Sequence, residues 1–377
     1  MEHFRLIVYI VLFILSFGFS VLINWLFLKY YRNFGIRNES EDIKEIRWSS
    51  TKKPALGGIS FFISFLLSFS MLGIIPDTII NTVNPFNIKL LGVAGASCLG
   101  FIIGLADDAY NTNPLVKLIG QFTCAFILIA TGVVLPISNL DSINFIFTTV
   151  WVIGLMNSIN MLDNMDGIST SISASIIIGI FTFLFTKNLI SNDICFLLIG
   201  VLASLLGFLL FNWNPSKMYM GDTGSMFLGV FLASISILSI WNERDPYGGN
   251  FQVRQFVIPM LLFIIPLIDT TTVTIRRLLR RQSPFVGGRD HITHHLAFLG
   301  LKDNYVAMIL LALSLISIPI VIIFTKIDWQ LPHTIIAFVY FFGLFGVIQY
   351  LYNKGAALNK QKNAAKVNKE VPIKKIS

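Results

Sequence analysis

The sequence predicts an all-α, polytopic membrane protein with about eleven transmembrane helices. Of its 377 residues, 55% are hydrophobic and only 13% are charged, far fewer charges than a soluble domain of this length carries. Apolar stretches of about 20 residues, the length that a helix needs to cross a bilayer, recur along the whole chain. They should be helical, because lipid offers the backbone no hydrogen-bonding partner. The expected spans are 6–28, 56–75, 88–106, 115–135, 144–162, 168–186, 193–211, 225–241, 255–275, 305–325 and 333–352.

Each of these runs is long enough to be a separate span, and short polar stretches divide them. The first, 6–28, is too long for a cleaved signal peptide, and no alanine precedes Ala55, so an A-x-A cleavage site is absent. The runs 144–162 and 168–186 are divided only by a short polar stretch, but each has the length of a span. The cysteines lie in three different runs and predict buried thiols without disulfide or zinc spacing: Cys98, Cys124 and Cys195.

The distribution of Lys and Arg predicts the orientation. The connections after the odd-numbered spans and the C-terminal tail hold 22 of the 28 Lys and Arg residues, and the other side holds six. Because cytoplasmic ends carry such an excess, we expect the N-terminus outside and the C-terminus in the cytoplasm. Residues 1–352 should form one membrane catalytic domain, and residues 353–377 a basic, disordered tail. The net charge of +8 then reflects topology and attraction to anionic lipid, with no nucleic-acid partner expected.

Five unusual polar stretches lie at the ends of spans on the predicted cytoplasmic side. The opposite connections, such as 136–143 and 187–192, hold no comparable cluster. One composite site at the cytoplasmic membrane face explains this segregation. The stretches are "TKKPALGG" (51–58), "LADDAYNTN" (105–113), "NSINMLDNMDGIS" (157–169), "FNWNPSKMYMGDTGS" (211–225) and "GGRDHITHHL" (287–296).

The acidic stretches have a structural and a functional interpretation. Asp107 and Asp108 could merely end a helix at the interface, but ionisable groups at membrane depth are usually functional, and two adjacent aspartates favour function. A second group repeats every third residue, so on a continuing helix its members would share a face, although Gly167 suggests a break. This group follows an apolar span directly, which favours a site over a solvated surface: Asn157, Asn160, Asp163 and Asp166.

The remaining two stretches also allow both interpretations. Asp222 lies in the Gly-bracketed turn "MGDTGS". In the functional interpretation, this turn lets backbone N–H groups approach a ligand; in the structural one, Asp222 only caps the next helix. His291, His294 and His295 follow i, i+3, i+4 spacing beside several arginines. Such a cluster can be incidental at an interface, but here it indicates an anion site.

The inventory of side chains indicates phosphate chemistry with a hard cation. Several carboxylates and few thiols suit Mg²⁺, with Mn²⁺ as a substitute, and Arg, Lys and His suit phosphates. Metal and cations catalyse phosphoryl transfer by positioning and charge neutralisation. The membrane location implies a lipid-borne reactant. We therefore expect Mg²⁺-dependent transfer of a phosphorylated group from a soluble nucleotide to a lipid phosphate.

Three alternatives stay open at this point. Zinc could bind three histidines together with Asp222, although the H-E-x-x-H arrangement of metalloproteases is absent. A secondary transporter also carries intramembrane ionisable residues, but near the bilayer midplane and in related halves, and no repeat is visible. A membrane prenyltransferase would also use Asp-rich Mg²⁺ motifs, but would move the prenyl chain and release pyrophosphate.

Taken together, the motifs resemble the polyprenyl-phosphate N-acetylhexosamine-1-phosphate transferase family. The resemblance runs from "KKPALGG" through "DDAYN", "NSINMLDNMDG" and "MGDTGS" to "HITHH". Members of this family start O-antigen lipopolysaccharide, enterobacterial common antigen, teichoic acid linkage and peptidoglycan synthesis. The resemblance implies that a UDP-N-acetylhexosamine and undecaprenyl phosphate give an undecaprenyl-diphospho-sugar and UMP, at the bacterial inner membrane. A homodimer is compatible with it.

The resemblance also implies a role for each motif residue. Asp107 and Asp108 match positions tied to Mg²⁺ and catalysis, and Asp222 matches a Mg²⁺ ligand. Asp163 and Asp166 match catalytic loop positions with nucleotide and metal contacts, and Asp269 matches a recurrent family aspartate. The positions implied to bind substrate are Lys53, Asn157, Asn160, Arg281, Arg289, His291, His294 and His295.

Two departures and the span count refine the expectation. Asn164 stands where the family usually has glycine, and asparagine tolerates a left-handed backbone better than most residues. Ser169 replaces an apolar residue, and neither change removes a ligand. Eleven spans and a cytoplasmic tail favour the GlcNAc-1-phosphate branch, whereas the phospho-MurNAc-pentapeptide transferases, the alternative, have ten spans.

Overall fold

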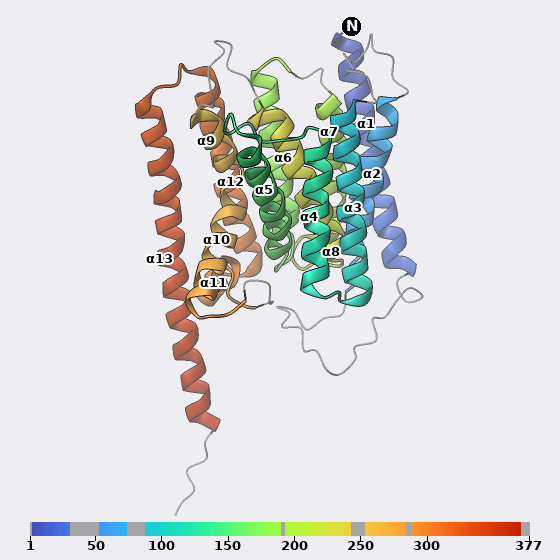
Figure 1. The fold of residues 1–377 in the computed structure, drawn as a ribbon. Helices are drawn as coiled ribbons and strands as arrows, with labels where there is room; N and C mark the ends of the chain where they lie inside the picture. Colours follow the sequence, from blue (N-terminus) through green and yellow to red (C-terminus); the bar gives the residue numbers. More distant parts are fainter. Residues whose placement is uncertain are drawn as a thin grey trace, which may run out of the picture.

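The computed structural model describes residues 2–30, 53–73, 87–189, 193–242, 253–283 and 288–370, and these parts of the chain are helices joined by loops (Figure 1). The basic connection 31–52, the segment 284–287 and the end of the tail, 371–377, lie outside the described residues. The helices are α1 Glu2–Tyr30, α2 Gly57–Leu72, α3 Ile88–Tyr110, α4 Pro114–Ala130, α5 Asp141–Leu162, α6 Ile168–Thr186, α7 Asp193–Asn212, α8 Gly221–Ser236 continued by the π-helix η2 Ile237–Trp241, α9 Val253–Leu262, α10 Ile264–Leu279, α11 Ile292–Phe298, α12 Asp303–Lys326 and α13 Leu331–Glu370.

The predicted polytopic membrane class is confirmed. In the described parts of the chain, eight helices are long and apolar enough to cross a membrane, or nine if α9 and α10 form one span. The shorter helices α2 and α4 are also apolar. Each of the eleven predicted spans therefore contains a helix, although not all of them have full spanning length.

The predicted span 255–275 is broken, which the hydropathy pattern did not show. Its two halves, α9 and α10, meet at Phe263 with an angle of 84° between them. Pro266 accounts for the break, because a proline has no N–H to donate to the carbonyl of Leu262, and its ring would clash with that carbonyl in a continuous helix. Pro259 lies inside α9 and weakens the helix further.

Helix α8 forms the centre of the bundle and lies against α3, α5 and α2. In the most apolar part of the span made of α8 and η2, 94% of the residues are buried, against 11% in that of α13. Two glycines let its N-terminus approach its neighbours. A Cβ on Gly104 of α3 would lie 2.1 Å from the Asp222 carbonyl oxygen, and one on Gly58 of α2 would lie 2.2 Å from the Gly224 nitrogen.

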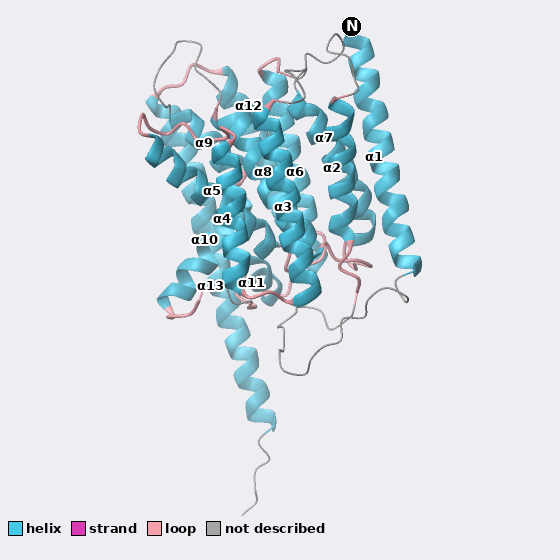
Figure 2. Ribbon diagram, turned by 45° about the vertical axis from the view of Figure 1, so that its right-hand side comes forward, coloured by secondary structure: helices cyan, strands magenta, loops and turns pink. Residues whose placement is uncertain are grey.

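The chain directions bring several helix ends together at the end of the bundle opposite the N-terminus (Figures 1 and 2). Helices α3, α5, α7 and α10 end there, and α4, α6 and α8 begin there, with α11 beside them. Helix α13 continues beyond this end as far as Glu370, where the sequence analysis expects a disordered tail from 353 onward. The described residues of all five polar stretches lie at this end of the bundle.

Candidate functional site

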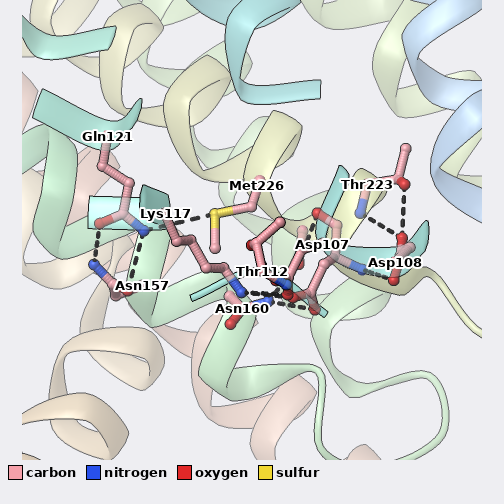
Figure 3. Close-up of polar contacts among 11 residues, drawn as sticks. Asp107, Asp108, Thr112, Lys117, Gln121, Asn157, Asn160, Thr223 and Met226 are labelled. Atoms are coloured by element: carbon pink, nitrogen blue, oxygen red, sulfur yellow. Dashed lines mark hydrogen bonds and ion pairs between the residues drawn. The ribbon is translucent and has the colours of Figure 1, made fainter. Parts of the chain in front are cut away.

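The centre of the site is a lysine that joins two of the predicted aspartates. Lys117, in the first turns of α4, donates from its Nζ to Asp107 Oδ2 at 2.8 Å and to Asp222 Oδ2 at 2.6 Å (Figure 3 shows Lys117 and Asp107). Asp107 Oδ1 also accepts hydrogen bonds from the Thr112 backbone at 2.9 Å and hydroxyl at 2.5 Å. The end of α3 and the starts of α4 and α8 are thus held together by charge.

Asp108 caps helix α8. Its Oδ1 accepts from the Asp222 backbone N–H at 3.0 Å, and its Oδ2 accepts from the Thr223 N–H at 2.8 Å and the Thr223 hydroxyl at 2.6 Å (Figure 3). A carboxylate at a helix N-terminus satisfies unpaired N–H groups and interacts favourably with the helix dipole. Both Asp108 oxygens are therefore engaged in holding Asp222 in place, and its role as a metal ligand stays a prediction.

The asparagines of α5 extend the same network. Asn160 donates from Nδ2 to Asp222 Oδ1 at 2.8 Å and to the Ser225 hydroxyl at 2.9 Å. Asn157 exchanges two hydrogen bonds with Gln121 of α4, at 2.8 and 3.2 Å, one turn further from the end of the bundle (Figure 3). The structure therefore brings Asn160 to the acidic residues and leaves Asn157 as a contact between helices.

Asp163 and Asp166 follow α5 in the loop before α6. Burial raises the pKa of Asp163 to about 8, and the nearby Asp222, Asp108 and Asp166 raise it further. Its position as the residue that ends α5 places it outside the spanning helix. A carboxyl group with this pKa is mostly protonated at neutral pH and reduces the negative charge of the site.

Asp166 belongs to a neighbouring group that includes the predicted Lys53. Its carboxylate accepts from the Ser216 backbone at 2.9 Å, the Ser216 hydroxyl at 2.7 Å and Asn214 Nδ2 at 3.1 Å. Lys53 lies 3.7 Å from Asp166 Oδ2, donates to Ser216 at 2.9 Å and lies 5.0 Å from the centroid of the Tyr219 ring. These residues join the stretches before α2, before α6 and before α8.

The histidines form the other side of the site and are buried. His291 Nδ1 lies 2.9 Å from Asp269 Oδ2 of α10, whose Oδ1 accepts from the Ile292 N–H at 2.9 Å. Burial lowers the pKa of His294 to about 3, and the nearby His291 contributes to this shift. Burial likewise lowers the pKa of His295 to about 4, with a contribution from the positive charge of Arg276. These two imidazoles are therefore neutral at physiological pH, so they offer a hydrogen bond rather than a charge.

Arginines supply the charge that these two histidines do not. Arg277 donates two hydrogen bonds to the Asp290 carboxylate, at 2.6 and 2.9 Å. Burial acts to raise the pKa of Asp290, but the Arg277 guanidinium outweighs it and holds this pKa below its ordinary value. A pocket of about 450 Å³ lies beside this pair. Arg281, predicted to bind substrate, is exposed and does not line it, whereas Arg289 does. The lining residues are Arg277, Arg280, Gln282, Ser283, Gly288, Arg289 and Asp290.

One hydrogen bond joins the acidic and basic sides. The Thr293 hydroxyl donates to Asn164 Oδ1 at 2.6 Å, and Asn164 Nδ2 donates to the Met161 carbonyl at 2.8 Å. Asn164 is the residue that departs from the glycine usual in the family. In this chain it is a contact between the loop after α5 and the histidines, which the sequence alone did not reveal.

Sequence reasoning also missed Lys117. It appeared only in the charge count, although a lone lysine near the start of the apolar run 115–135 is the kind of membrane-depth ionisable residue that marks a site. Thr112 and Thr223, which bind Asp107 and Asp108, were not named either. Threonine is too common at helix ends for its type alone to indicate such a contact.

The donor chemistry suits a hard cation, although the described side chains form no complete metal cluster. Among the residues that the structure describes, no group of three or more His, Cys, Asp or Glu side chains is arranged to hold a metal ion. Yet the Asp107 and Asp222 carboxylates converge on a single cationic group, the Lys117 ammonium. Oxygen ligands of this kind are those that Mg²⁺ prefers.

Comparison with known proteins supports the resemblance. The sequence profile described as glycosyl transferase family 4 matches residues 90–240, from the first turn of α3 into η2. A probable undecaprenyl-phosphate N-acetylglucosaminyl 1-phosphate transferase of Bacillus subtilis (strain 168) is 26% identical over 313 residues, 80% of this chain and 82% of the relative.

Two further relatives represent both branches of the family. A decaprenyl-phosphate N-acetylglucosaminephosphotransferase of Mycobacterium leprae is 26% identical over 283 residues, 69% of this chain and 70% of the relative. A phospho-N-acetylmuramoyl-pentapeptide-transferase of Staphylococcus carnosus is 30% identical over 219 residues, 52% of this chain and 66% of the relative. With its ordered motifs and its polytopic helical fold, the chain belongs to glycosyl transferase family 4, as a multi-pass membrane phosphotransferase.

Proposed function

We propose that this protein transfers N-acetylglucosamine 1-phosphate from UDP-N-acetylglucosamine to undecaprenyl phosphate and releases UMP. The observation that carries the proposal is the meeting of acidic and basic groups at one end of an apolar helix bundle: Lys117 with Asp107 and Asp222 on one side, and Arg277, Arg289 and the histidines on the other. A soluble diphosphate and a membrane-borne phosphate can both reach such a place. The product lipid would begin a cell-envelope polysaccharide.

Each side of the site has a part in this reaction. The phosphate of the lipid is largely ionised at neutral pH, so it can attack the β-phosphorus of the donor without a general base. The basic pocket beside Arg277 and Arg289 suits the charge of the diphosphate. The neutral His294 and His295 offer hydrogen bonds, and Lys53 with Tyr219 offers a cation and an aromatic face for the nucleotide.

We propose Mg²⁺, replaceable by Mn²⁺, as the metal. Asp107 and Asp222 would hold it, because their carboxylates already meet at one cation, and Asp108 would keep Asp222 in position. When bound, the metal supplies charge neutralisation on the diphosphate. A divalent ion between these carboxylates would compete with Lys117 for the same oxygens.

The GlcNAc branch is favoured by the extent of similarity. The alignment with the Bacillus relative covers 80% of the chain, while those with the phospho-N-acetylmuramoyl-pentapeptide-transferases of Staphylococcus carnosus and Staphylococcus aureus cover 52% and 74%. The second candidate donor is therefore UDP-MurNAc-pentapeptide.

The decisive experiment is UMP release by the purified protein with undecaprenyl phosphate and a panel of UDP-sugars that includes both candidates. We expect UMP with UDP-GlcNAc, no UMP after Mg²⁺ is chelated, and recovery on adding Mg²⁺ or Mn²⁺. Asp222→Asn, which keeps the shape and removes the charge, should lose nearly all turnover. UMP release with UDP-MurNAc-pentapeptide alone would move the protein to the other branch, and pyrophosphate release would contradict the proposal.

We also propose that this end of the bundle faces the cytoplasm at the bacterial inner membrane, on the basis of the Lys and Arg distribution. Single cysteines at the exposed Lys217 and Gln282 report on the site end, and one at the exposed Asn139 reports on the other end. In a background without the three native cysteines, an impermeant thiol reagent should label only Asn139→Cys in intact cells. Labelling of the other two instead would reverse the orientation.

A further inference from the structure

The last helix makes a close contact with the histidine side of the site. The residues of α13 up to 362 are mostly exposed or half-buried, but Tyr352 is only 1% exposed and Gly355 is buried where α13 meets α11. Figure 1 shows α13 passing beside α10 and α11 before it continues beyond the bundle. The contact therefore lies at the level of the histidines and not at the tip of the helix.

Gly355 permits this contact because it has no side chain. A Cβ at this position would lie 2.1 Å from the His295 carbonyl oxygen and 2.9 Å from its carbonyl carbon, and backbone atoms cannot move aside as a flexible side chain can. The same helix contains Gly343 and Gly346, at which a Cβ would meet nothing within 4 Å. Only Gly355, of these three, is required for close packing.

Tyr352 lies between a histidine and an arginine. Its ring centroid is 3.7 Å from that of His295, with an interplanar angle of 33°, and the Arg276 guanidinium lies 4.0 Å from the ring centroid. The Tyr352 hydroxyl donates to the Asp290 carbonyl at 3.1 Å. Arg276 also donates to Gln349 at 3.0 Å and Asn353 at 2.7 Å, so α10, α11 and α13 are fastened at one place.

The orientation of the His295 ring depends on this stacking. His291 has a carboxylate, Asp269, to orient its ring, at 2.9 Å. The His295 Nδ1, by contrast, is buried and has no hydrogen-bond partner among the described residues. No hydrogen bond at this atom fixes the ring, which packs against Phe298 of its own helix, 5.3 Å between centroids, and more closely against Tyr352 of α13.

We propose that Tyr352 and Gly355 are positioning residues, which hold His295 in the orientation that the donor diphosphate requires. They act through His295 and do not touch the reacting atoms. The proposal rests on the function proposed above, and it gives α13 a part in catalysis besides membrane insertion. A displacement of about 1 Å in a binding group can cost about a hundredfold in rate, so a helix contact of this kind is sufficient to affect turnover.

The first test compares alanine at the three glycines of α13. Gly355→Ala should lower kcat/KM for UDP-GlcNAc by about tenfold to a hundredfold, because the added methyl group displaces the His295 backbone. Gly343→Ala and Gly346→Ala should stay within about twofold of the wild type, since alanine is the better helix former and has room at both positions. Equal activity of all three variants would overturn the proposal.

The second test asks whether Tyr352 acts through His295. Tyr352→Phe keeps the ring and should retain most activity, whereas Tyr352→Leu removes the stacking and should raise KM for UDP-GlcNAc by about tenfold. In a Tyr352→Leu, His295→Ala double variant, the loss should be no larger than that of His295→Ala alone. Losses that multiply would show that Tyr352 does not work through this histidine.

Hydrogen–deuterium exchange of residues 291–299 separates this proposal from the proposed function, because it needs no activity. Gly355→Ala should speed exchange of this segment, and Gly346→Ala should not. If the wild type uses no UDP-sugar but exchange responds in this way, the function fails and the contact stands. If the wild type is active and exchange is the same in both variants, the positioning proposal is wrong.

Discussion

The two sides of the site are built by different forces. The acidic centre, which comprises Asp107, Asp108, Asp222, Asn160 and Lys117, is held by hydrogen bonds and charges that cross between α3, α4, α5 and α8. In the histidine segment, residues 288–299, Asp290 and His291 are bound by Arg277 and Asp269, but the buried His294 and His295 are uncharged at neutral pH, and the ring of His295 packs on Tyr352. The first side should respond most to changes of charge, and the second to changes of shape.

This difference follows from the helices that carry each side. The acidic centre surrounds the N-terminus of α8, the most buried spanning helix, where an unpaired charge would be costly, and each of its three carboxylates has a partner. Helix α11 of the histidine segment lies against α13 and α12, and the segment is bound to α10 through Asp269 and Arg277. Its position therefore depends on α13, whereas the acidic centre is held by the buried core of the bundle.

The largest expected effect comes from removing the charge of Lys117. Lys117→Met keeps much of the side-chain length but leaves Asp107 and Asp222 facing each other without an ammonium. We expect turnover to fall by about a thousandfold, comparable with the loss of a positioned electrostatic group in other enzymes. UMP release measures it. Lys89→Met, at the exposed first turn of α3 near the other end, is the control, and normal turnover in Lys117→Met would show that charge does not organise this centre.

A substitution at Asp108 distinguishes its role as the cap of α8 from a role as a metal ligand. Asp108→Ala removes the cap of α8, and we expect a loss of about 1–2 kcal/mol in the free energy of unfolding and weaker turnover. If Asp108 acts as a cap, the Mg²⁺ concentration that gives half of maximal activity should not change. A large rise in that concentration would make it a direct ligand. Asp141→Ala, in the exposed first turn of α5 at the opposite end, is the matched substitution.

The neutral histidines predict a pH dependence of stability. A histidine in the unfolded chain takes up a proton near pH 6.5, but folded His294 does so only near pH 3 and His295 near pH 4. Below pH 6.5 the unfolded state thus binds more protons, and the folded state loses stability as pH falls, by up to about 1.4 kcal/mol per pH unit for each histidine.

Thermal unfolding in detergent between pH 7 and pH 5 measures this dependence. His294→Gln should make the loss of stability on acidification shallower, because one of the groups that titrate is removed. Thr293→Val changes the neighbouring residue without changing a titratable group, so it should shift stability equally at each pH. An unchanged slope in His294→Gln would mean that this histidine is not buried as the neutral form.

The smallest expected effect concerns the hydrogen bond that joins the two sides. Asn164→Ala and Thr293→Val each remove one partner and should each cost about 1 kcal/mol in the free energy of unfolding. Because the two residues bind each other, the double variant should cost less than the sum of the single ones. Thr182→Val, on the exposed face of α6, serves as the control. Additive losses would indicate that the acidic centre and the histidine segment are independent.

Much of this protein was predictable from its sequence because the deciding forces are local. Apolar runs predicted the helices, since a lipid environment requires each backbone polar group to be satisfied within its own segment. The polar stretches at alternate ends of those runs predicted one composite site, because consecutive spans alternate in direction. Asp107, Asp222 and Asn160 were accordingly named, and the structure brings them together.

Only the tertiary structure decided which of these groups meet. Lys117 bridges Asp107 and Asp222 although it is separated from them by 10 and 105 residues, and Asp108 caps a helix that begins more than 100 residues later. The contact of Tyr352 with His295 depends on where α13 lies after the 84° bend between α9 and α10. Hydropathy records the preference of each residue for lipid or water, but side-chain pairing across helices depends on their packing, which no local pattern contains.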